Sequence, residues 1–338
     1  MRTSPRISSI DAFRAWAVIG IIVLHIFDPP PDLYGLRVMV ALPLRTAVPF
    51  FFAVSGFLYA RGLRGGRSPA VQFKRTMTRL VPLYLVWCVV YFINPPFGAI
   101  LEQGVLAVYH ARFVEALQNW ERILLVGPAF HLWFFNALIS AVVLFHLLGA
   151  YRRLRFALVV AIGLYTVGVL GGPYAQLPIG LHLPVHTRHF VFFSFLPFVL
   201  GFALHEYETR SVAVGTGLAI WSAGMIGMAG ETWLLDKLGA AAPHAVEYTF
   251  STVLMGVGVL WMARSRSRAL TSAPLASLGR LAPGLYASHI LIALRLHWIE
   301  DFFDPRVWMV VAPVLTFVGA LAVTWVLSKW SFTRRWVT

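Results

Sequence analysis

Apolar blocks long enough to cross a lipid bilayer recur along the whole chain. They cover about residues 12–28, 38–60, 78–96, 130–149, 154–173, 189–206, 211–230, 245–263, 281–298 and 307–328. A helix of about 20 apolar residues spans the hydrocarbon core of a bilayer. Only 12% of the residues are charged, against roughly 25% in average soluble domains. The sequence therefore predicts an all-α, polytopic transmembrane bundle of about ten spans, and it excludes a soluble enzyme, a disordered chain and a disulfide scaffold.

The distribution of charge predicts how the spans are oriented. If the N-terminus is cytoplasmic and the connections alternate between sides, most of the 28 Lys and Arg residues lie in the cytoplasm, with only three of the 14 acidic residues, Asp11, Glu206 and Glu208. The cytoplasmic cations are Arg2, Arg6, Arg14, Arg61, Arg64, Arg67, Lys74, Arg75, Arg79, Arg152, Arg153, Arg155, Arg210, Arg264, Arg266, Arg268, Arg280, Lys329, Arg334 and Arg335. This asymmetry follows the positive-inside rule and predicts that both termini are cytoplasmic.

The organisation of the chain is simple. No small-residue cleavage site follows the first block, so we interpret it as a retained span. The longest outer connection, 97–129, alternates apolar and charged residues at helical spacing, which predicts one or two short interfacial helices. We expect a single transmembrane domain over 1–338, with no appended soluble domain. The net charge of +14 is explained by topology, and no nucleic-acid partner is expected.

Three ionisable residues of the first block, Asp11, Arg14 and His25, are candidates for function because charge within a membrane is costly. At roughly 100° per residue, Arg14 and His25 are nearly in register and Asp11 lies close to the same stripe. His25 lies about 16 Å beyond Arg14 along the helix, toward the outer half. The alternative is an interfacial Asp–Arg pair and a structural histidine.

Arg75 and Arg79 lie four residues apart at the start of the third block, where they favour binding of a phosphate group. Topology alone explains this pair equally well. His131 and Trp133 open the fourth block, and His289 lies within the ninth. The loop histidines His182, His186 and His189 match no firm rule for metal ligands, so no metal is expected.

Taken in order, several short motifs resemble the bacterial membrane acyltransferase-3 family. They are Asp11-Ala-Phe-Arg14 with Ala17-Val18 and His25, the Pro-Phe-Phe block from Pro49 to Leu58, Arg79-Leu-Val-Pro82-Leu-Tyr84, Leu132-Trp133-Phe134, Phe195 to Gly201, and Leu278-Gly279-Arg280 followed by Leu285-Tyr286 and His289. The chain departs from the family's Arg-x-x-Arg before the third span, because Thr76 stands where the first Arg is expected; Lys74 or Arg75 is the substitute.

The resemblance implies an O-acyltransferase of the cytoplasmic membrane that moves an acyl group, with acetyl expected, from acyl-CoA to a hydroxyl of a cell-envelope carbohydrate, glycolipid or other acceptor. It implies His25, Arg14 and Asp11 as catalytic residues and Lys74, Arg75 and Arg79 as acyl-CoA ligands. His131, Trp133 and His289 are expected at the acceptor. A histidine base and a histidine acyl carrier both remain open, and a homo-oligomer is compatible with the sequence. The competing hypotheses are a transporter or flippase of a lipid-linked glycan and a homologue that only binds its ligand.

Overall fold

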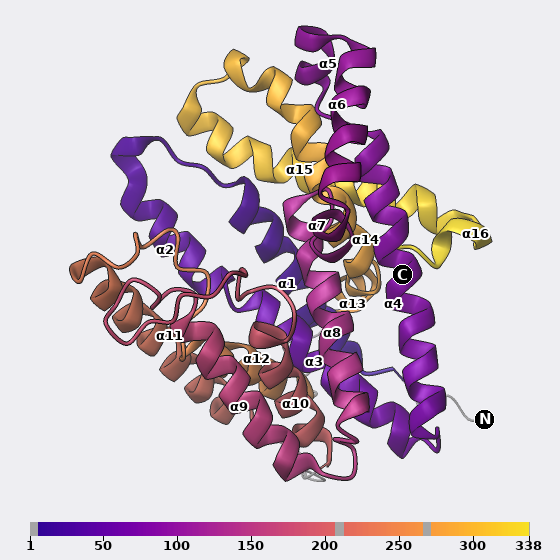
Figure 1. The fold of residues 1–338 in the computed structure, drawn as a ribbon, viewed down its shortest axis with the longest axis vertical. Helices are drawn as coiled ribbons and strands as arrows, with labels where there is room; N and C mark the ends of the chain where they lie inside the picture. Colours follow the sequence, from indigo (N-terminus) through magenta and orange to yellow (C-terminus); the bar gives the residue numbers. More distant parts are fainter. Residues whose placement is uncertain (1–5, 207–212, 266–271, 338) are drawn as a thin grey trace.

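The computed structural model describes residues 6–206, 213–265 and 272–337, which consist of helices and loops without a strand. Each predicted apolar block contains a helix (Figure 1). These helices are α1 (Ser8–Ile26), α3 (Ala47–Arg64), α4 (Pro69–Ile93), α8 (Trp133–Leu147), α9 (Leu154–Leu170), α10 (Val191–Glu206), α11 (Val214–Lys237), α12 (Thr252–Arg264), α14 (Ala282–Leu296) and α15 (Pro305–Lys329). The all-helical fold class is therefore confirmed.

Six stretches are long and apolar enough to cross a membrane on length and composition. They are Ser8–Ile26, Pro31–Arg64, Pro69–Gln103, Phe130–Leu147, Val214–Lys237 and Pro305–Lys329. The helices α9, α10 and α12 are apolar but shorter. The chain is thus a multi-pass membrane protein, whereas the count of ten spans and the orientation of the termini stay predictions.

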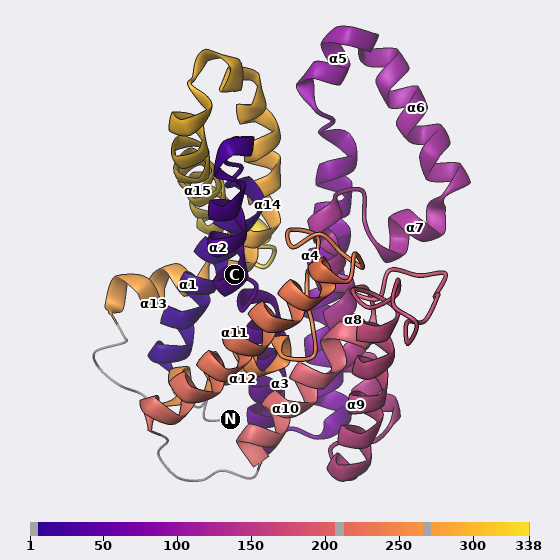
Figure 2. The same ribbon diagram turned by 90° about the vertical axis from the view of Figure 1, so that its left-hand side faces the viewer.

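Two regions are divided into more helices than the sequence predicts. The block at 38–60 is divided between α2 (Tyr34–Leu44), which follows the 3₁₀ turn η1 (Pro31–Leu33), and α3. The outer connection forms three short helices instead of one or two, α5 (Phe97–Gln103), α6 (Val105–Gln118) and α7 (Trp120–Leu125). Gly104 separates the first two with a φ of 81°, a conformation that glycine adopts readily. Figure 2 shows these helices as an arm beside the one formed by α14 and α15.

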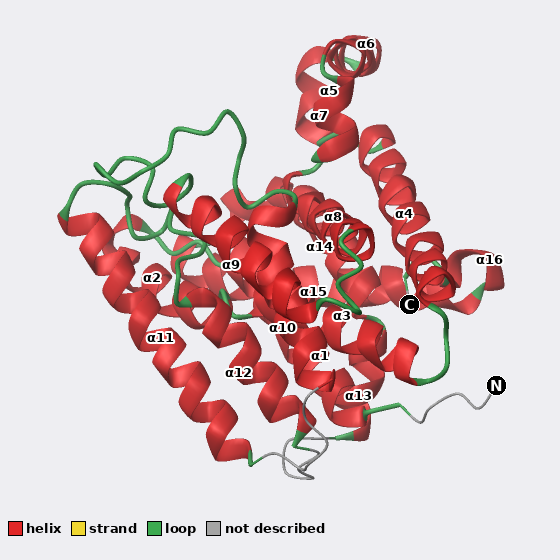
Figure 3. Cartoon of the chain, turned by 60° about the horizontal axis from the view of Figure 1, so that its bottom comes forward, coloured by secondary structure: helices red, strands yellow, loops and turns green. Residues whose placement is uncertain are grey.

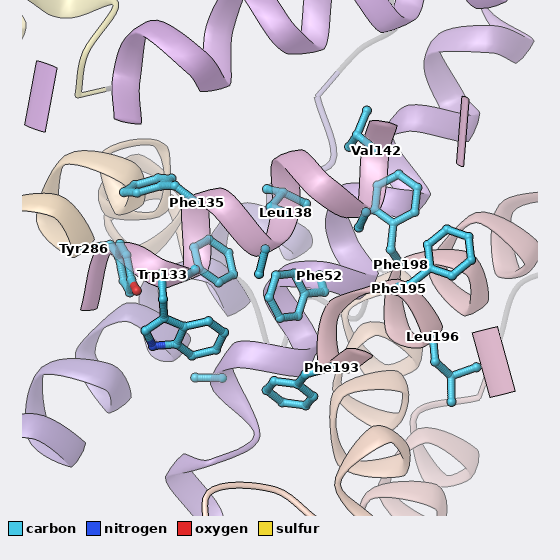
Figure 4. Close-up of a cluster of buried hydrophobic side chains, with 14 of the residues drawn as sticks. Phe52, Trp133, Phe135, Leu138, Val142, Phe193, Phe195, Leu196, Phe198 and Tyr286 are labelled. Carbon is cyan, nitrogen blue, oxygen red and sulfur yellow. The ribbon is translucent and has the colours of Figure 1, made fainter. Parts of the chain in front are cut away.

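Small residues allow the central helices to pack at close range. A Cβ atom at Gly56 of α3 would overlap the Phe198 carbonyl of α10, and one at Gly201 of α10 would overlap the Ala53 carbonyl of α3. Contact of this kind is typical of membrane helices. Phe52, Phe195 and Phe198 fill the space around the crossing, and each is at most 1% exposed (Figure 4). On the neighbouring face, α10, α12 and α11 lie side by side (Figure 3).

Four short elements flank the longer helices. They are η2 (Phe130–Leu132) before α8, α13 (Ala273–Arg280) before α14, η4 (His297–Phe302) after it, and α16 (Ser331–Arg334) near the C-terminus. Gly279 of α13 lies against the backbone of Asp11, where a Cβ would overlap the Asp11 carbonyl oxygen. This close approach fixes the start of α1, and with it the position of Arg14.

Ion pairs between distant connections join segments that the charge pattern places on one side of the membrane. Asp32 pairs with Arg306 at 2.7 Å, between two predicted outer connections. Arg64 pairs with Glu206 at 2.8 Å, between two predicted cytoplasmic ones. The cytoplasmic assignments of Arg2, Glu208, Arg210, Arg266 and Arg268 fall outside the described residues.

Candidate active site

The first charged pair of α1 is formed as its spacing suggests. Arg14 Nη1 donates to Asp11 Oδ1 at 3.1 Å, and the two side chains are only 17% and 12% exposed. Because a half-buried ion pair is less screened than a surface pair, Asp11 holds the guanidinium of Arg14 in a defined position. Arg14 also lines an internal cavity.

This cavity has a volume of about 320 Å³ and is basic at one end. Four arginines line it, Arg14 from α1, Arg67 from the connection before α4, and Arg75 and Arg79 from α4. We call this the inner cavity. Lys74 is exposed and does not line it. Arginine guanidinium groups bind phosphate through paired hydrogen bonds, so the inner cavity suits a polyphosphorylated ligand.

Aromatic residues also line the inner cavity. They include Phe134, Phe135 and Tyr286, of which Phe135 and Tyr286 are labelled in Figure 4. The Tyr286 hydroxyl donates to the carbonyl oxygen of His131. Its ring lies 5.6 Å from the ring of His131 and 5.7 Å from that of His289, measured between centroids. Tyr286 therefore contacts both the inner cavity and a group of histidines.

Three histidines from separate apolar blocks meet beyond Tyr286. The His25 ring stacks on the His289 ring with centroids 5.6 Å apart, and the His131 ring meets His289 edge-on at 5.0 Å. His131 and His289 are fully buried, whereas His25 is exposed and also contacts Phe130. We call these three residues the histidine cluster. His25 is its accessible member and shares α1 with Arg14.

The hydrogen bonds of the two buried histidines fix their tautomers. His289 Nδ1 lies 2.6 Å from the Tyr286 carbonyl oxygen, and His131 Nε2 lies 3.3 Å from the Ala287 carbonyl oxygen. Since a carbonyl only accepts, both of these nitrogens carry a proton. His289 Nε2 and His131 Nδ1 are then lone-pair acceptors, and both are buried without a hydrogen-bond partner. An unsatisfied buried acceptor is costly, which makes the cluster a candidate for chemistry.

Trp133 occupies different surroundings from the histidine cluster. Its ring packs against Phe52, Phe193 and His189, with the Arg188 guanidinium 5.6 Å from its centroid. No ring contact joins Trp133 to the cluster among the described residues. The structure thus places His131 and His289 beside His25, whereas Trp133 lies beside the loop before α10.

The structure also shows the surroundings of residues outside the histidine cluster. Asp28 pairs with Arg37 at 2.7 Å, as an aqueous loop residue would. Arg67, Gln72 and Tyr286 line the inner cavity although sequence reasoning gave them no role. The sequence does not distinguish Arg67 from the other cations of its predicted cytoplasmic connection. In the structure, Arg67 Nη1 donates to Gln72 Oε1 at 3.0 Å, a contact that the sequence does not reveal. Within the described ranges, no group of three or more His, Cys, Asp or Glu residues is arranged to hold a metal ion.

A bundle of apolar helices with arginines and histidines facing its interior defines a multi-pass membrane protein whose candidate site lies within the helices. Residues 7–329 match the family model described as an acyltransferase domain, and the chain belongs to this acyltransferase-3 family. The family assignment inferred from the motifs is therefore confirmed.

The chain is also similar to a serine/alanine racemase of Enterococcus gallinarum, at 27% identity over 270 residues. The match covers 73% of this chain but 36% of that protein, so the chain spans about a third of the length of this relative. No solved structure matches the chain.

Proposed function

We propose that the protein transfers an acyl group, acetyl in the simplest case, from cytoplasmic acyl-CoA to a hydroxyl of a carbohydrate or glycolipid at the cytoplasmic membrane. One observation carries the proposal: Tyr286 lines the arginine-lined inner cavity, and its ring also contacts His131 and His289 of the histidine cluster. An anion-binding cavity next to buried imidazole acceptors suits a donor with phosphates at one end and a thioester at the other.

Different residues of the inner cavity bind different parts of the acyl-CoA donor. Arg75, Arg79 and Arg14 hold the phosphates at the mouth of the inner cavity, and Asp11 orients Arg14. The acyl arm passes between apolar walls that include Leu83 and Leu138. Tyr286 lines the cavity next to His131 and His289, so the acyl arm passes this ring to reach the histidines.

The transfer step uses the accessible imidazole of His25. The neutral ring removes the proton of the acceptor hydroxyl while the hydroxyl oxygen attacks the thioester carbonyl. A C–O bond forms, the C–S bond breaks, and the imidazolium returns its proton to the thiolate of CoA. In the alternative route His25 itself takes the acyl group from sulfur and then passes it to the hydroxyl. His289, stacked on His25, offers its free Nε2 to either route as a positioning group.

The experiment is a thiol-release assay on the purified protein in lipid nanodiscs, with acetyl-CoA and extracted envelope glycans. Changing His25→Ala is expected to lower turnover by about 10²–10⁴-fold, the usual contribution of a positioned base. The matched control is His110→Ala, an exposed histidine of α6. Full turnover by folded His25→Ala protein would remove His25 from the mechanism. An acylated His25 peptide, found by mass spectrometry after quenching, selects the carrier route.

The same assay distinguishes the proposed acyltransferase from the competing hypothesis of a transporter. Arginines and histidines within a helical bundle also occur along the pathways of transporters. A transporter of a lipid-linked glycan would release no CoA thiol, while it would move a labelled glycan across the bilayer of a proteoliposome. An acyltransferase gives the opposite pair of results.

A further inference from the structure

A second cavity lies away from the inner cavity, at the end of the bundle that the charge pattern places outside the cell. Its volume is about 670 Å³, and its walls come from residues 171–176 after α9, 183–188 before α10 and 240–248 before α12. Small-molecule sites commonly have volumes of about 300–1,000 Å³. We call this cavity the outer pocket. None of the residues that the sequence suggested for the acceptor lines it.

Hydrogen bonds hold the loops of the outer pocket in place. The Glu231 carboxylate of α11 accepts from Tyr174 Oη at 2.7 Å, from the Phe250 amide at 3.0 Å and from the Ser251 amide at 2.9 Å. Tyr248 Oη lies 2.8 Å from the Gly168 carbonyl and 2.6 Å from Thr187 Oγ1. These bonds join the loops before α10 and α12 to the helices, so the pocket is preformed.

The polar groups of the outer pocket are mixed in kind and balanced in charge. Arg188 and Glu247 form an ion pair across the lining, and Gln176 and His186 add exposed groups that both donate and accept. An anionic ligand would meet the Glu247 carboxylate, and a cationic ligand would meet Arg188. A neutral polyol suits the lining better, because each hydroxyl both donates and accepts hydrogen bonds.

Arg188 connects the outer pocket with the candidate active site. Its guanidinium lies over the Trp133 ring, and its Nε donates to His189 Nε2 at 3.2 Å. Since a guanidinium nitrogen only donates, His189 Nε2 accepts this bond and carries no proton. Trp133 follows His131 by two residues at the start of α8. Through Arg188 the outer pocket therefore reaches the segment that carries His131 of the histidine cluster.

We propose that the outer pocket binds a neutral carbohydrate and holds it beside Arg188, next to the segment that carries His131. This assignment rests on the proposed function in so far as the bound sugar is the acyl acceptor. It places acceptor recognition in the loops 171–188 and 240–248, instead of at His131, Trp133 and His289, where the sequence predicted it.

The test is saturation-transfer NMR on the full-length protein in nanodiscs, without acyl-CoA. The probes are methyl glycosides of glucose, galactose, mannose and N-acetylglucosamine, and the methyl glucuronide as the charged counterpart of the glucoside. At least one neutral glycoside is expected to bind, and the glucuronide to bind at least about tenfold more weakly than the glucoside. Failure of every neutral glycoside to bind, or stronger binding of the glucuronide, overturns the proposal.

Two matched pairs of variants locate the binding. Ala245 lines the outer pocket and Ala242 in the same loop does not, and both are exposed. Ala245→Trp is expected to abolish glycoside binding by filling the pocket, and Ala242→Trp to preserve it. Likewise His186→Ala is expected to weaken binding at least about threefold, and His182→Ala, at an exposed position outside the lining, to leave it unchanged. Equal binding within both pairs overturns the site.

Failure of this inference can be told apart from failure of the proposed function. A glycoside that binds in the outer pocket but causes no release of CoA thiol leaves the site standing and removes acyl transfer. Release of CoA thiol with an unchanged KM for the acceptor in Ala245→Trp removes the site and leaves acyl transfer standing.

Discussion

Three cations that lie within six residues of each other, Lys74, Arg75 and Arg79, have different surroundings. Arg75 and Arg79 line the inner cavity, and Lys74 does not. A hydrogen bond to a charged group contributes roughly 1.5–3 kcal/mol, so loss of one phosphate contact should raise the KM for acyl-CoA about 10–100-fold. We expect this increase in Arg75→Ala and Arg79→Ala, measured as CoA release at varied acetyl-CoA, with Lys74→Ala as the control. An equal effect of all three substitutions would indicate that net charge, rather than the cavity, binds the donor.

The residues of the site were partly visible in the sequence. Arg14, His25 and His289 stand out because they interrupt apolar blocks. That His25 and His289 stack could not be predicted, because it depends on how the first and ninth blocks pack against each other. Tyr286 appeared only within a family motif, and its place at the cavity had no signal of its own because an aromatic residue in a membrane helix is ordinary.

At the scale of elements, glycine at the crossing of α3 and α10 decides whether the two helices can touch. Gly201→Val should push a branched side chain into the Ala53 carbonyl and destabilise the fold by roughly 1–3 kcal/mol or more. Gly163→Val in α9 is the control, because a Cβ there has no neighbour within 4 Å. Thermal unfolding in detergent should show a lower Tm for Gly201→Val than for Gly163→Val. Equal Tm values for the two variants would show that the crossing tolerates a Cβ.

The helices themselves followed from the periodicity and length of the apolar blocks, whereas their breaks did not. The division between α2 and α3 falls at Arg45 and Thr46, inside a block that reads as continuous. Arg45 is held there by a bond from its Nη2 to the His244 carbonyl at 2.8 Å, a partner almost 200 residues away. A tertiary contact of this kind overrides local pattern, and no window of sequence contains it.

For the whole molecule, the ion pairs between connections carry information about topology that the charge count lacks. Asp32 with Arg306 and Arg64 with Glu206 each join two segments predicted to lie on one side. If the number of spans predicted between two partners were wrong by one, or by any odd number, the partners would lie on opposite sides of the membrane and could not pair. The pairs therefore support the parity of the predicted spans, and the absolute orientation rests on the positive-inside rule alone.

Labelling of single cysteines in intact bacterial cells tests this orientation, because Cys88 is the chain's one native cysteine and can be changed to Ser. Cysteines introduced at Glu102 and Ala242 lie in predicted outer connections, and those at Ser68 and Arg152 in predicted cytoplasmic ones; all four positions are exposed. A membrane-impermeant maleimide should label the first two in intact cells and the second two only after permeabilisation. The reverse pattern would place the inner cavity outside the cell, away from cytoplasmic acyl-CoA. Labelling of Ser68→Cys and Glu102→Cys from the same side would show that α4 does not span the membrane.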